Sequence, residues 1–402
     1  MTTRRHRPDF ALVILVLGLL MLGLIVIFSI GPLVAQFENS QSGSNFGAMY
    51  FFTHHLVAVA LAIAALVAGY TVPYQKLAQG AKALVLTALG LCLMVSLLGA
   101  LHVQSLVTCD LGACRSLRLP GLGMGFQPVE LLKLGLLFYL AGLIAKRKAN
   151  NLLAKKELWV PVGVLAALTA VMVGWWQKDL GSTVVIMFML VCMVFVGGVK
   201  WQQLLLILGV GAVAVLALVL LAPHRLQRLA SFNGGGDKYH IENALVGLGT
   251  GGLFGVGLGN SIQATGYLPE ALSDSIFAII GEIWGFAGTA LVLAAFFALL
   301  MRILRAGRLA ANTEQTLCAV GVFAWLAAHV IINVGGMTGI TPMKGITLPF
   351  LSYGGTSMLF VSFAIGVVLQ ISGWARRETE HEDSYSWRRQ RGARHATYRR
   401  GA

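Results

Sequence analysis

Long runs of apolar residues, separated by short polar stretches, dominate this chain. A helix that crosses a bilayer needs about 20 mostly apolar residues. Ten segments reach about this length, so the pattern predicts an all-α polytopic membrane protein with about ten transmembrane helices. The predicted spans are residues 10–35, 50–73, 80–103, 127–145, 158–176, 182–199, 202–221, 275–301, 315–335 and 352–374.

Composition and charge agree with this pattern and orient it. The 402 residues are 57% hydrophobic and only 11% charged, whereas soluble domains have about 25% charged residues. Most lysine and arginine residues fall on one side when the spans alternate, which places both termini in the cytoplasm. The net charge of +14 is therefore mainly a topology signal, and we expect no nucleic-acid partner. The basic tail 376–400 is expected to lie on anionic lipid headgroups or to be disordered.

The predicted organisation has three parts. Residues 1–9 form a cytoplasmic N-terminal tail, residues 10–374 the transmembrane domain, and residues 375–402 a basic cytoplasmic tail. Within the domain, 222–274 forms a large extracytoplasmic loop between the seventh and eighth spans. It is too small to bury much core alone, so we expect it to pack on the membrane face as loops and short helices. The glycines of 247–259 should let the backbone approach a ligand or a helix closely.

Acidic residues stand at the start of the eighth span. Glu270 and Asp274 precede it, and Glu282 lies about two helical turns inside it. Ionisable groups at or inside a membrane are costly, so they indicate a functional site. The alternative is structural, because Ser273 or Asp274 could cap the helix by accepting from its first free N–H groups.

The last outer loop, 336–351, is rich in proline and glycine as it enters the final span. Non-helical backbone at that depth is tolerated only where it is buried in protein or lines a cavity. The functional interpretation is a cavity wall that presents Lys344, and the alternative is a capped re-entrant turn.

Six motifs, in this order along the chain, together resemble the SEDS family of shape, elongation, division and sporulation glycosyltransferases, which includes FtsW, RodA and SpoVE. They are Gln127-Pro-Val-Glu-Leu-Leu-Lys133, Gln177-Lys-Asp-Leu-Gly-Ser182, His224-Arg-Leu-Gln-Arg228, Gly257-Leu-Gly-Asn-Ser261, Tyr267-Leu-Pro-Glu270 through Glu282, and Lys344 through Gly355.

The last motif resembles the division branch, typified by FtsW. The elongation branch tends to have Thr and Pro where this chain has Lys344 and Thr347. The chain also departs from the family pattern: Leu272-Ser273 replaces the usual His-Thr before Asp274, and Lys178 replaces a usual proline. The carboxylate is present in each motif, so the departures affect the expected positioning of substrate more than catalysis.

The resemblance implies polymerisation of lipid II into glycan strands during division, with an undecaprenyl-diphosphate-linked chain as donor. Asp274 matches the family's catalytic aspartate and is the expected general base. The leaving diphosphate needs Lys, Arg or a divalent cation such as Mg²⁺ or Mn²⁺. The expected substrate-binding residues are Arg225, Arg228, Lys344, Lys133, Glu130, Glu270 and Ser352.

Several of these residues have structural alternatives. Glu130 and Lys133 are three apart and can pair on one helix face. Asp179 precedes a helix start, where a cap-like role is at least as plausible as substrate contact. Glu282 is deep enough to need a buried ion pair or hydrogen-bond network, so we expect it to support the site rather than to react.

The expected setting is the bacterial cytoplasmic (inner) membrane, with the active face extracytoplasmic. The resemblance implies a class B penicillin-binding protein as transpeptidase partner, together with other divisome membrane proteins. The alternatives are an elongation-type polymerase, a lipid II flippase or transporter, and a non-catalytic divisome scaffold. In one outer loop, Cys109 and Cys114 are positioned so that an oxidising envelope would permit a disulfide.

Overall fold

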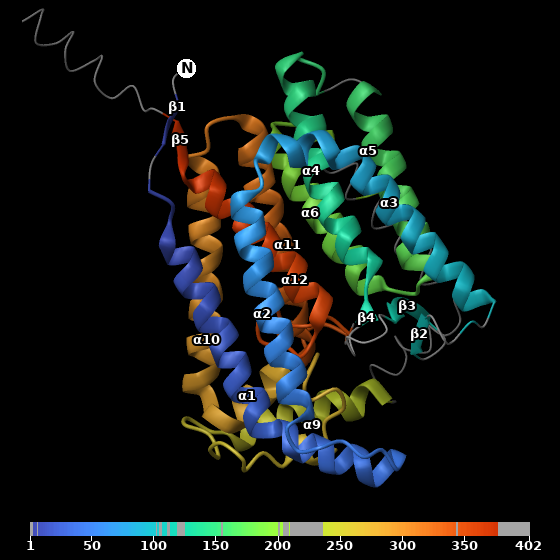
Figure 1. The fold of residues 1–402 in the computed structure, drawn as a ribbon, viewed down its shortest axis with the longest axis vertical. Helices are drawn as coiled ribbons and strands as arrows, with labels where there is room; N and C mark the ends of the chain where they lie inside the picture. Colours follow the sequence, from blue (N-terminus) through green and yellow to red (C-terminus); the bar gives the residue numbers. More distant parts are fainter. Residues whose placement is uncertain are drawn as a thin grey trace, which may run out of the picture.

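A computed structural model describes residues 3–5, 7–101, 103, 107–110, 113–118, 125–153, 156–199, 202–203, 209, 236–342 and 345–376. Within these ranges nine helices are long and apolar enough to cross a membrane, which confirms a polytopic helical protein. The expected seventh span, 202–221, lies almost wholly outside the described residues. The nine helices are α1 (Phe10–Ser42), α2 (Tyr50–Thr71), α3 (Tyr74–Ala100), α4 (Pro128–Ala149), α5 (Lys156–Thr169) with its π-helical continuation η1 (Ala170–Trp176), α6 (Leu180–Gly197), α10 (Ile276–Arg308), α11 (Thr313–Met337) and α12 (Gly355–Ser372) (Figure 1).

Two short antiparallel sheets add to this helical body, at opposite ends of the bundle (Figure 1). One pairs β1 (Thr3–Arg5) with β5 (Trp374–Arg376), beside the N-terminus. The other orders β2 (Val107–Asp110), β3 (Ala113–Arg118) and β4 (Gly125–Phe126), between α3 and α4. The expected outer loop between the third and fourth spans is therefore a β-sheet. In this sheet Cys114 is disulfide-bonded and Cys109 is its backbone partner across the ladder, as expected for this pair.

Helix α11 forms the centre of the bundle. It packs against α4, α6, α10 and α12, and most of its residues are buried. A second tight contact joins α2 to α12, because a Cβ built on Gly69 or on Gly366 would collide with the backbone of the facing helix. Small residues that let two backbones approach are the usual packing device of membrane helices. This contact holds α2 and α12 side by side near the C-terminal ends of both helices.

The loop predicted to be extracytoplasmic contains α9 (Gly236–Thr250) and the 3-10 turn η2 (Gln263–Thr265), in agreement with the expected short helices. Its glycine-rich segment 252–257 lies against α10, which is broken at Gly285 (φ 64°, ψ −159°). Four backbone hydrogen bonds of 2.8–3.0 Å join 252–257 to residues 282–287. A Cβ on Gly255 would collide with the Ile283 carbonyl. The expected close approach of glycine backbone to a helix is confirmed.

Candidate active site

Asp274 lies in the last turn before α10 and is half-buried. The N-cap of α10 is Ser275, with no side-chain cap hydrogen bond. Instead the Ser275 hydroxyl donates to the Pro269 carbonyl at 2.7 Å and lies 2.7 Å from His240 Nε2. The capping alternative for Ser273 and Asp274 is therefore wrong at this helix start, and the Asp274 carboxylate is available for another role.

The Asp274 carboxylate faces the loop that enters α12. A Cβ built on Gly345 would lie 3.2 Å from Asp274 Oδ2, and Gly345 has a φ of 62°. Glycine fits this position for both reasons, since it has no side chain and tolerates a positive φ. The Tyr353 backbone N–H donates to the Leu272 carbonyl at 2.7 Å, so the two segments are also joined through their main chains. Lys344, which adjoins Gly345, lies outside the described residues.

Asn333 and Ser352 hold the same two segments together through side chains. The Asn333 amide donates to the carbonyls of Asp274 and Ile346, at 2.7 Å each. The Ser352 hydroxyl donates to the Ser273 carbonyl at 2.6 Å and accepts from a backbone N–H of its own loop. Ser352 is buried and its hydroxyl is engaged, so in this geometry it clamps the loop. The expected substrate contact of Ser352 stays a prediction.

The surroundings of Asp274 suit a proton acceptor. The pKa of Asp274 is raised to about 7, mainly by burial and then by the charge of Glu270; Arg115 acts in the opposite direction, and Asp179 adds a smaller increase. A general base is most effective when its pKa lies near the working pH. Asp274 therefore has the pKa expected of a base that acts at neutral pH.

Arg115 is a site residue that the sequence analysis did not identify. It projects from β3, and its guanidinium donates to the carbonyls of Gln177 (3.2 Å) and Lys178 (2.9 Å). Lys178 has a φ of 53°, which the ring of proline cannot adopt. The departure from the family's usual proline therefore changes the backbone of this turn as well as a side chain. The only sequence signal for Arg115 is a cation on the outer side that topology does not need.

Glu130 and Lys133 form a buried ion pair of 2.7 Å between α4 residues, the structural alternative for these two positions. Lys133 Nζ also lies 3.2 Å from His329 Nε2, and the Trp325 indole donates to the same nitrogen at 3.3 Å. Since Nε2 accepts, Nδ1 carries the proton and donates to the Thr347 carbonyl at 3.2 Å. The network thus supports the loop beside Asp274 from within the bundle. Lys133 is only 1% exposed, so a substrate would have to displace these partners to reach it.

Glu282 and Asp179 both have partners that position backbone. Glu282 accepts from the Ser261 hydroxyl and from the Ile262 N–H (2.9 Å), which fixes the turn after the glycine-rich segment. Asp179 is the N-cap of α6 and accepts from the Ser182 N–H at 2.9 Å. Both carboxylates therefore hold backbone segments in place, which is the supporting role expected for these two residues.

Of the remaining expected site residues, Glu270 alone lies within the described part of the chain. Glu270 is exposed, has a φ of 51°, and accepts from the Ser273 hydroxyl at 2.8 Å. Arg225 and Arg228 lie outside the described residues, like Lys344. Among the residues that the structure describes, no group of three or more His, Cys, Asp or Glu side chains could hold a metal ion. The divalent cation stays a prediction.

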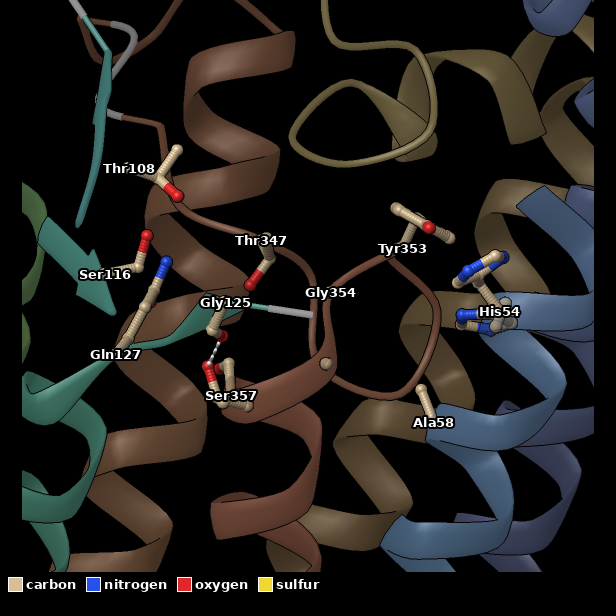
Figure 2. A pocket seen from close by; sticks show the side chains of 13 residues that line it. His54, Ala58, Thr108, Ser116, Gly125, Gln127, Thr347, Tyr353, Gly354 and Ser357 are labelled. Carbon is tan, nitrogen blue, oxygen red and sulfur yellow. Dashed lines mark hydrogen bonds between the residues drawn. The ribbon is translucent and has the colours of Figure 1, made fainter. Parts of the chain in front are cut away.

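A polar cavity of about 360 Å³ lies between α2, the β2–β3–β4 sheet and the start of α12. In Figure 2, Thr108, Ser116 and Gln127 face Thr347 across the cavity, and His54 lies beyond the turn at Gly354. The complete lining is His54, His55, Ala58, Thr108, Ser116, Gly125, Gln127, Thr347, Tyr353, Gly354, Gly355, Thr356 and Ser357. The loop that faces Asp274 therefore forms part of a cavity wall through Thr347, as expected, whereas the presentation of Lys344 on that wall stays a prediction.

Curated relatives match most of this chain. Stage V sporulation protein E of Bacillus subtilis is 32% identical over 384 residues, covering 94% of this chain and 100% of that protein. The probable peptidoglycan glycosyltransferase FtsW of Coxiella burnetii is 34% identical over 377 residues, covering 90% and 96%.

Solved structures share the fold. A chain from "Structural coordination of polymerization and crosslinking by a peptidoglycan synthase complex" aligns with a TM-score of 0.70 at 24% identity, covering 91% of this chain and 97% of that chain. The rod shape determining protein RodA of Thermus thermophilus aligns with a TM-score of 0.63, also at 24% identity, covering 91% and 96%. The family model described as "Cell cycle protein" matches residues 10–377, and this chain therefore belongs to the FtsW/RodA/SpoVE family.

Proposed function

We propose that this protein is a peptidoglycan glycosyltransferase that polymerises lipid II into glycan strands during cell division. The observation that carries the proposal is the Asp274 carboxylate, which has a pKa of about 7 and faces the loop that lines a polar cavity, while Asn333 of α11 holds the Asp274 backbone in place. Relatives from several bacteria, matched over most of this chain, carry the name peptidoglycan glycosyltransferase FtsW. The active face is the extracytoplasmic side of the cytoplasmic membrane.

The chemistry assigned to Asp274 is general-base catalysis. The 4-hydroxyl oxygen of the acceptor sugar forms a bond to the anomeric carbon of the donor, and the bond from that carbon to the diphosphate breaks with inversion. Asp274 takes the hydroxyl proton, and undecaprenyl diphosphate leaves. A positioned base contributes about 10²–10⁴-fold to such a step. With a pKa of about 7, roughly half of the Asp274 carboxyls are ionised at neutral pH.

The leaving diphosphate requires positive charge. Arg225, Arg228 and Lys344 are the proposed cations, since arginine makes bidentate contacts with phosphate. Lys344 adjoins Gly345, which contacts the Asp274 carboxylate, so its place in the chain suits this role. A bound divalent cation, Mg²⁺ or Mn²⁺, would supply the same neutralisation.

A transpeptidase partner, a class B penicillin-binding protein, is also proposed, along with other divisome membrane proteins. The solved chain at a TM-score of 0.70 comes from a complex said to coordinate polymerization and crosslinking. On this chain, Phe286, Leu291 and Phe297 of α10 are each more than 60% exposed, an apolar surface suited to a single transmembrane helix of the partner. Faster polymerisation and co-purification with the cognate transpeptidase would support this arrangement. Full activity without the transpeptidase, and no co-purification from native membranes, would contradict it.

The function is tested by incubating the purified protein with lipid II. We expect glycan polymer from the wild type and none from Asp274→Asn, which keeps the shape of the side chain but cannot accept the proton. Asp9→Asn, the same substitution at the far end of α1, is the matched control and should retain activity. Translocated lipid without polymer would indicate a flippase, and neither product would indicate a scaffold. Polymerisation by Asp274→Asn at the wild-type rate would refute the role of Asp274.

A further inference from the structure

The cavity beside the α12 start has a lining that suits an anion. Its 13 lining residues include hydroxyl, imidazole and amide side chains and not one carboxylate. Arg118 of β3 adds positive charge nearby, because its Nε lies 3.4 Å from the hydroxyl of the lining residue Thr108. The volume of about 360 Å³ falls within the usual range for small-molecule sites, about 300–1,000 Å³.

The start of α12 contributes its free N–H groups to this cavity. Gly354 is the N-cap, has extended backbone (φ −176°), and supplies no side-chain cap. The first three residues of the helix, Gly355, Thr356 and Ser357, all line the cavity. The first N–H groups of a helix have no partner within the helix and carry a partial positive charge. This arrangement is a general anion-binding device.

Two buried side chains independently indicate a ligand. His55 is 0% exposed and lines the cavity, and neither of its ring nitrogens has a hydrogen-bond partner within the described residues. The Ser357 hydroxyl, in a residue 9% exposed, likewise has no partner there. Buried polar groups are normally hydrogen-bonded. Phosphate oxygens at this place would accept from the His55 ring N–H, from the Ser357 hydroxyl and from the helix N–H groups together.

The position of the cavity suggests which anion it takes. His55 lies in the second turn of α2, at the outer end, and the next two residues, Leu56 and Val57, are exposed apolar side chains. A lipid chain could therefore run along α2 with its polar head in the cavity. Thr347 and Tyr353 of the lining belong to the loop that is bonded to the Asp274 segment. An anion bound here would lie against the loop that faces the Asp274 carboxylate.

We propose that this cavity binds the diphosphate of a prenyl-diphosphate lipid, with His55, Ser357 and the α12 N–H groups as its ligands. The assignment rests on the proposed function, since the lipid-linked donor and the leaving group of that reaction both contain this diphosphate. In this site the diphosphate lies between α2 and α12 and is bound by neutral groups. These groups act in addition to the arginine and lysine side chains already proposed to neutralise the diphosphate.

The test measures binding to the full-length protein in lipid nanodiscs, with three probes: undecaprenyl diphosphate, undecaprenol and inorganic diphosphate. The variants are Ser357→Ala and His55→Leu. Ser362→Ala is the matched control, because Ser362 lies in the same helix, is also buried with no partner for its hydroxyl in the described residues, and is not part of the lining. We expect the affinity for undecaprenyl diphosphate to fall about 10-fold or more in each variant, as for the loss of a hydrogen bond to a charged group, and to stay unchanged in Ser362→Ala.

Several results would overturn the assignment: equal affinity in Ser357→Ala and the wild type, undecaprenol binding as tightly as undecaprenyl diphosphate, or inorganic diphosphate competing as well as the lipid. Ser357→Ala removes one oxygen and should fold, so it decides the matter if His55→Leu does not fold. The readout is binding, so it is separate from the proposed function. That function fails if the wild type makes no glycan, whereas this site fails if the wild type binds the lipid and the variants bind it equally well.

Discussion

The side-chain amide of Asn333 donates a hydrogen bond to the backbone carbonyl of Asp274, with 2.7 Å between the two atoms. The same nitrogen donates to the Ile346 carbonyl at 2.7 Å. One amide group of α11, the central helix, therefore sets the spacing between the segment that carries the base and the loop that lines the cavity. Asn333 touches no reacting atom, so it is a positioning residue.

Asn333→Ala should lower the turnover number of lipid II polymerisation by about 10- to 100-fold and leave KM nearly unchanged, because the base shifts while substrate contacts remain. Two buried carbonyls also lose their partner, which should lower the free energy of unfolding by about 1–3 kcal/mol. Initial rates over a range of lipid II concentrations, with thermal melts in the same detergent, measure both effects. A loss of stability with an unchanged turnover number would limit Asn333 to a structural role.

The pKa of Asp274 predicts how activity depends on pH. Since burial raises this pKa to about 7, the ionised base form grows as pH rises through 7. The polymerisation rate should increase about 10-fold per pH unit below 7 and level off above it. Rates measured between pH 5.5 and 8.5 test this, and a profile already flat from pH 5.5 would contradict it.

The raised pKa of Asp274 predicts that stability falls as pH rises, whereas activity increases. An unfolded aspartate has a pKa near 4, whereas folded Asp274 has one of about 7. Between these values the folded protein holds a proton that the unfolded chain releases, so the contribution of Asp274 to stability falls as pH rises from about 4 to about 7. Below and above this window it is constant. Melting temperatures of the wild type should fall across the window relative to Asp274→Asn, and parallel curves would count against the raised pKa.

The disulfide of Cys114 should hold the β2–β3 hairpin against the end of α3. A Cβ on Gly99 of α3 would lie 2.5 Å from Cys114 Sγ, so the hairpin packs closely there. Cys114→Ser should lower the free energy of unfolding by about 2 kcal/mol, the loop-closure effect of a short loop. It should also weaken polymerisation, because Arg115 follows directly. Cys192→Ser, which removes a free cysteine, is the control. Unreduced peptide mapping should show Cys109 joined to Cys114; two free thiols there would refute the pairing.

Gly255 and Gly259 form a matched pair that tests the contact between the glycine-rich segment and α10. Their φ values are 82° and 80°, but a Cβ on Gly255 meets the Ile283 carbonyl whereas nothing lies within 4 Å of one on Gly259. Gly259→Ala should lower the free energy of unfolding by about 1–2 kcal/mol, the cost of holding an alanine at a positive φ. Gly255→Ala should lower the free energy of unfolding by about 1–3 kcal/mol more than Gly259→Ala does, because the new methyl group also collides with the Ile283 carbonyl. Thermal melts of the two variants measure the difference, and equal losses would contradict the contact.

The membrane-spanning body was predictable from sequence because long apolar runs carry a strong signal. The pattern also drew attention to Asp274, because a carboxylate before an apolar run is unusual, but it left a capping role open; the role of general base came from the resemblance and stays a prediction. His329 and Asn333 were not identified, although they are polar residues four apart in an apolar span, a spacing that places them on one helix face. Arg115 could not be placed, because only the folding of an outer loop into a hairpin brings it to Asp274. The pairing of Glu130 with Lys133 was one of two alternatives that their spacing left open, and the structure shows the buried pair.

The break in α10 at Gly285 has a consequence for how the protein is assembled. The backbone groups of 282–287 that the break leaves without helical partners are bonded to residues 252–257, which precede α10 in the chain. Those residues are synthesised first, so their docking cannot be completed until 282–287 have been made. The segment that carries Asp274 waits longer still, because its partners Asn333 and Tyr353 are synthesised after α10. The final position of the proposed base therefore depends on the C-terminal part of the chain.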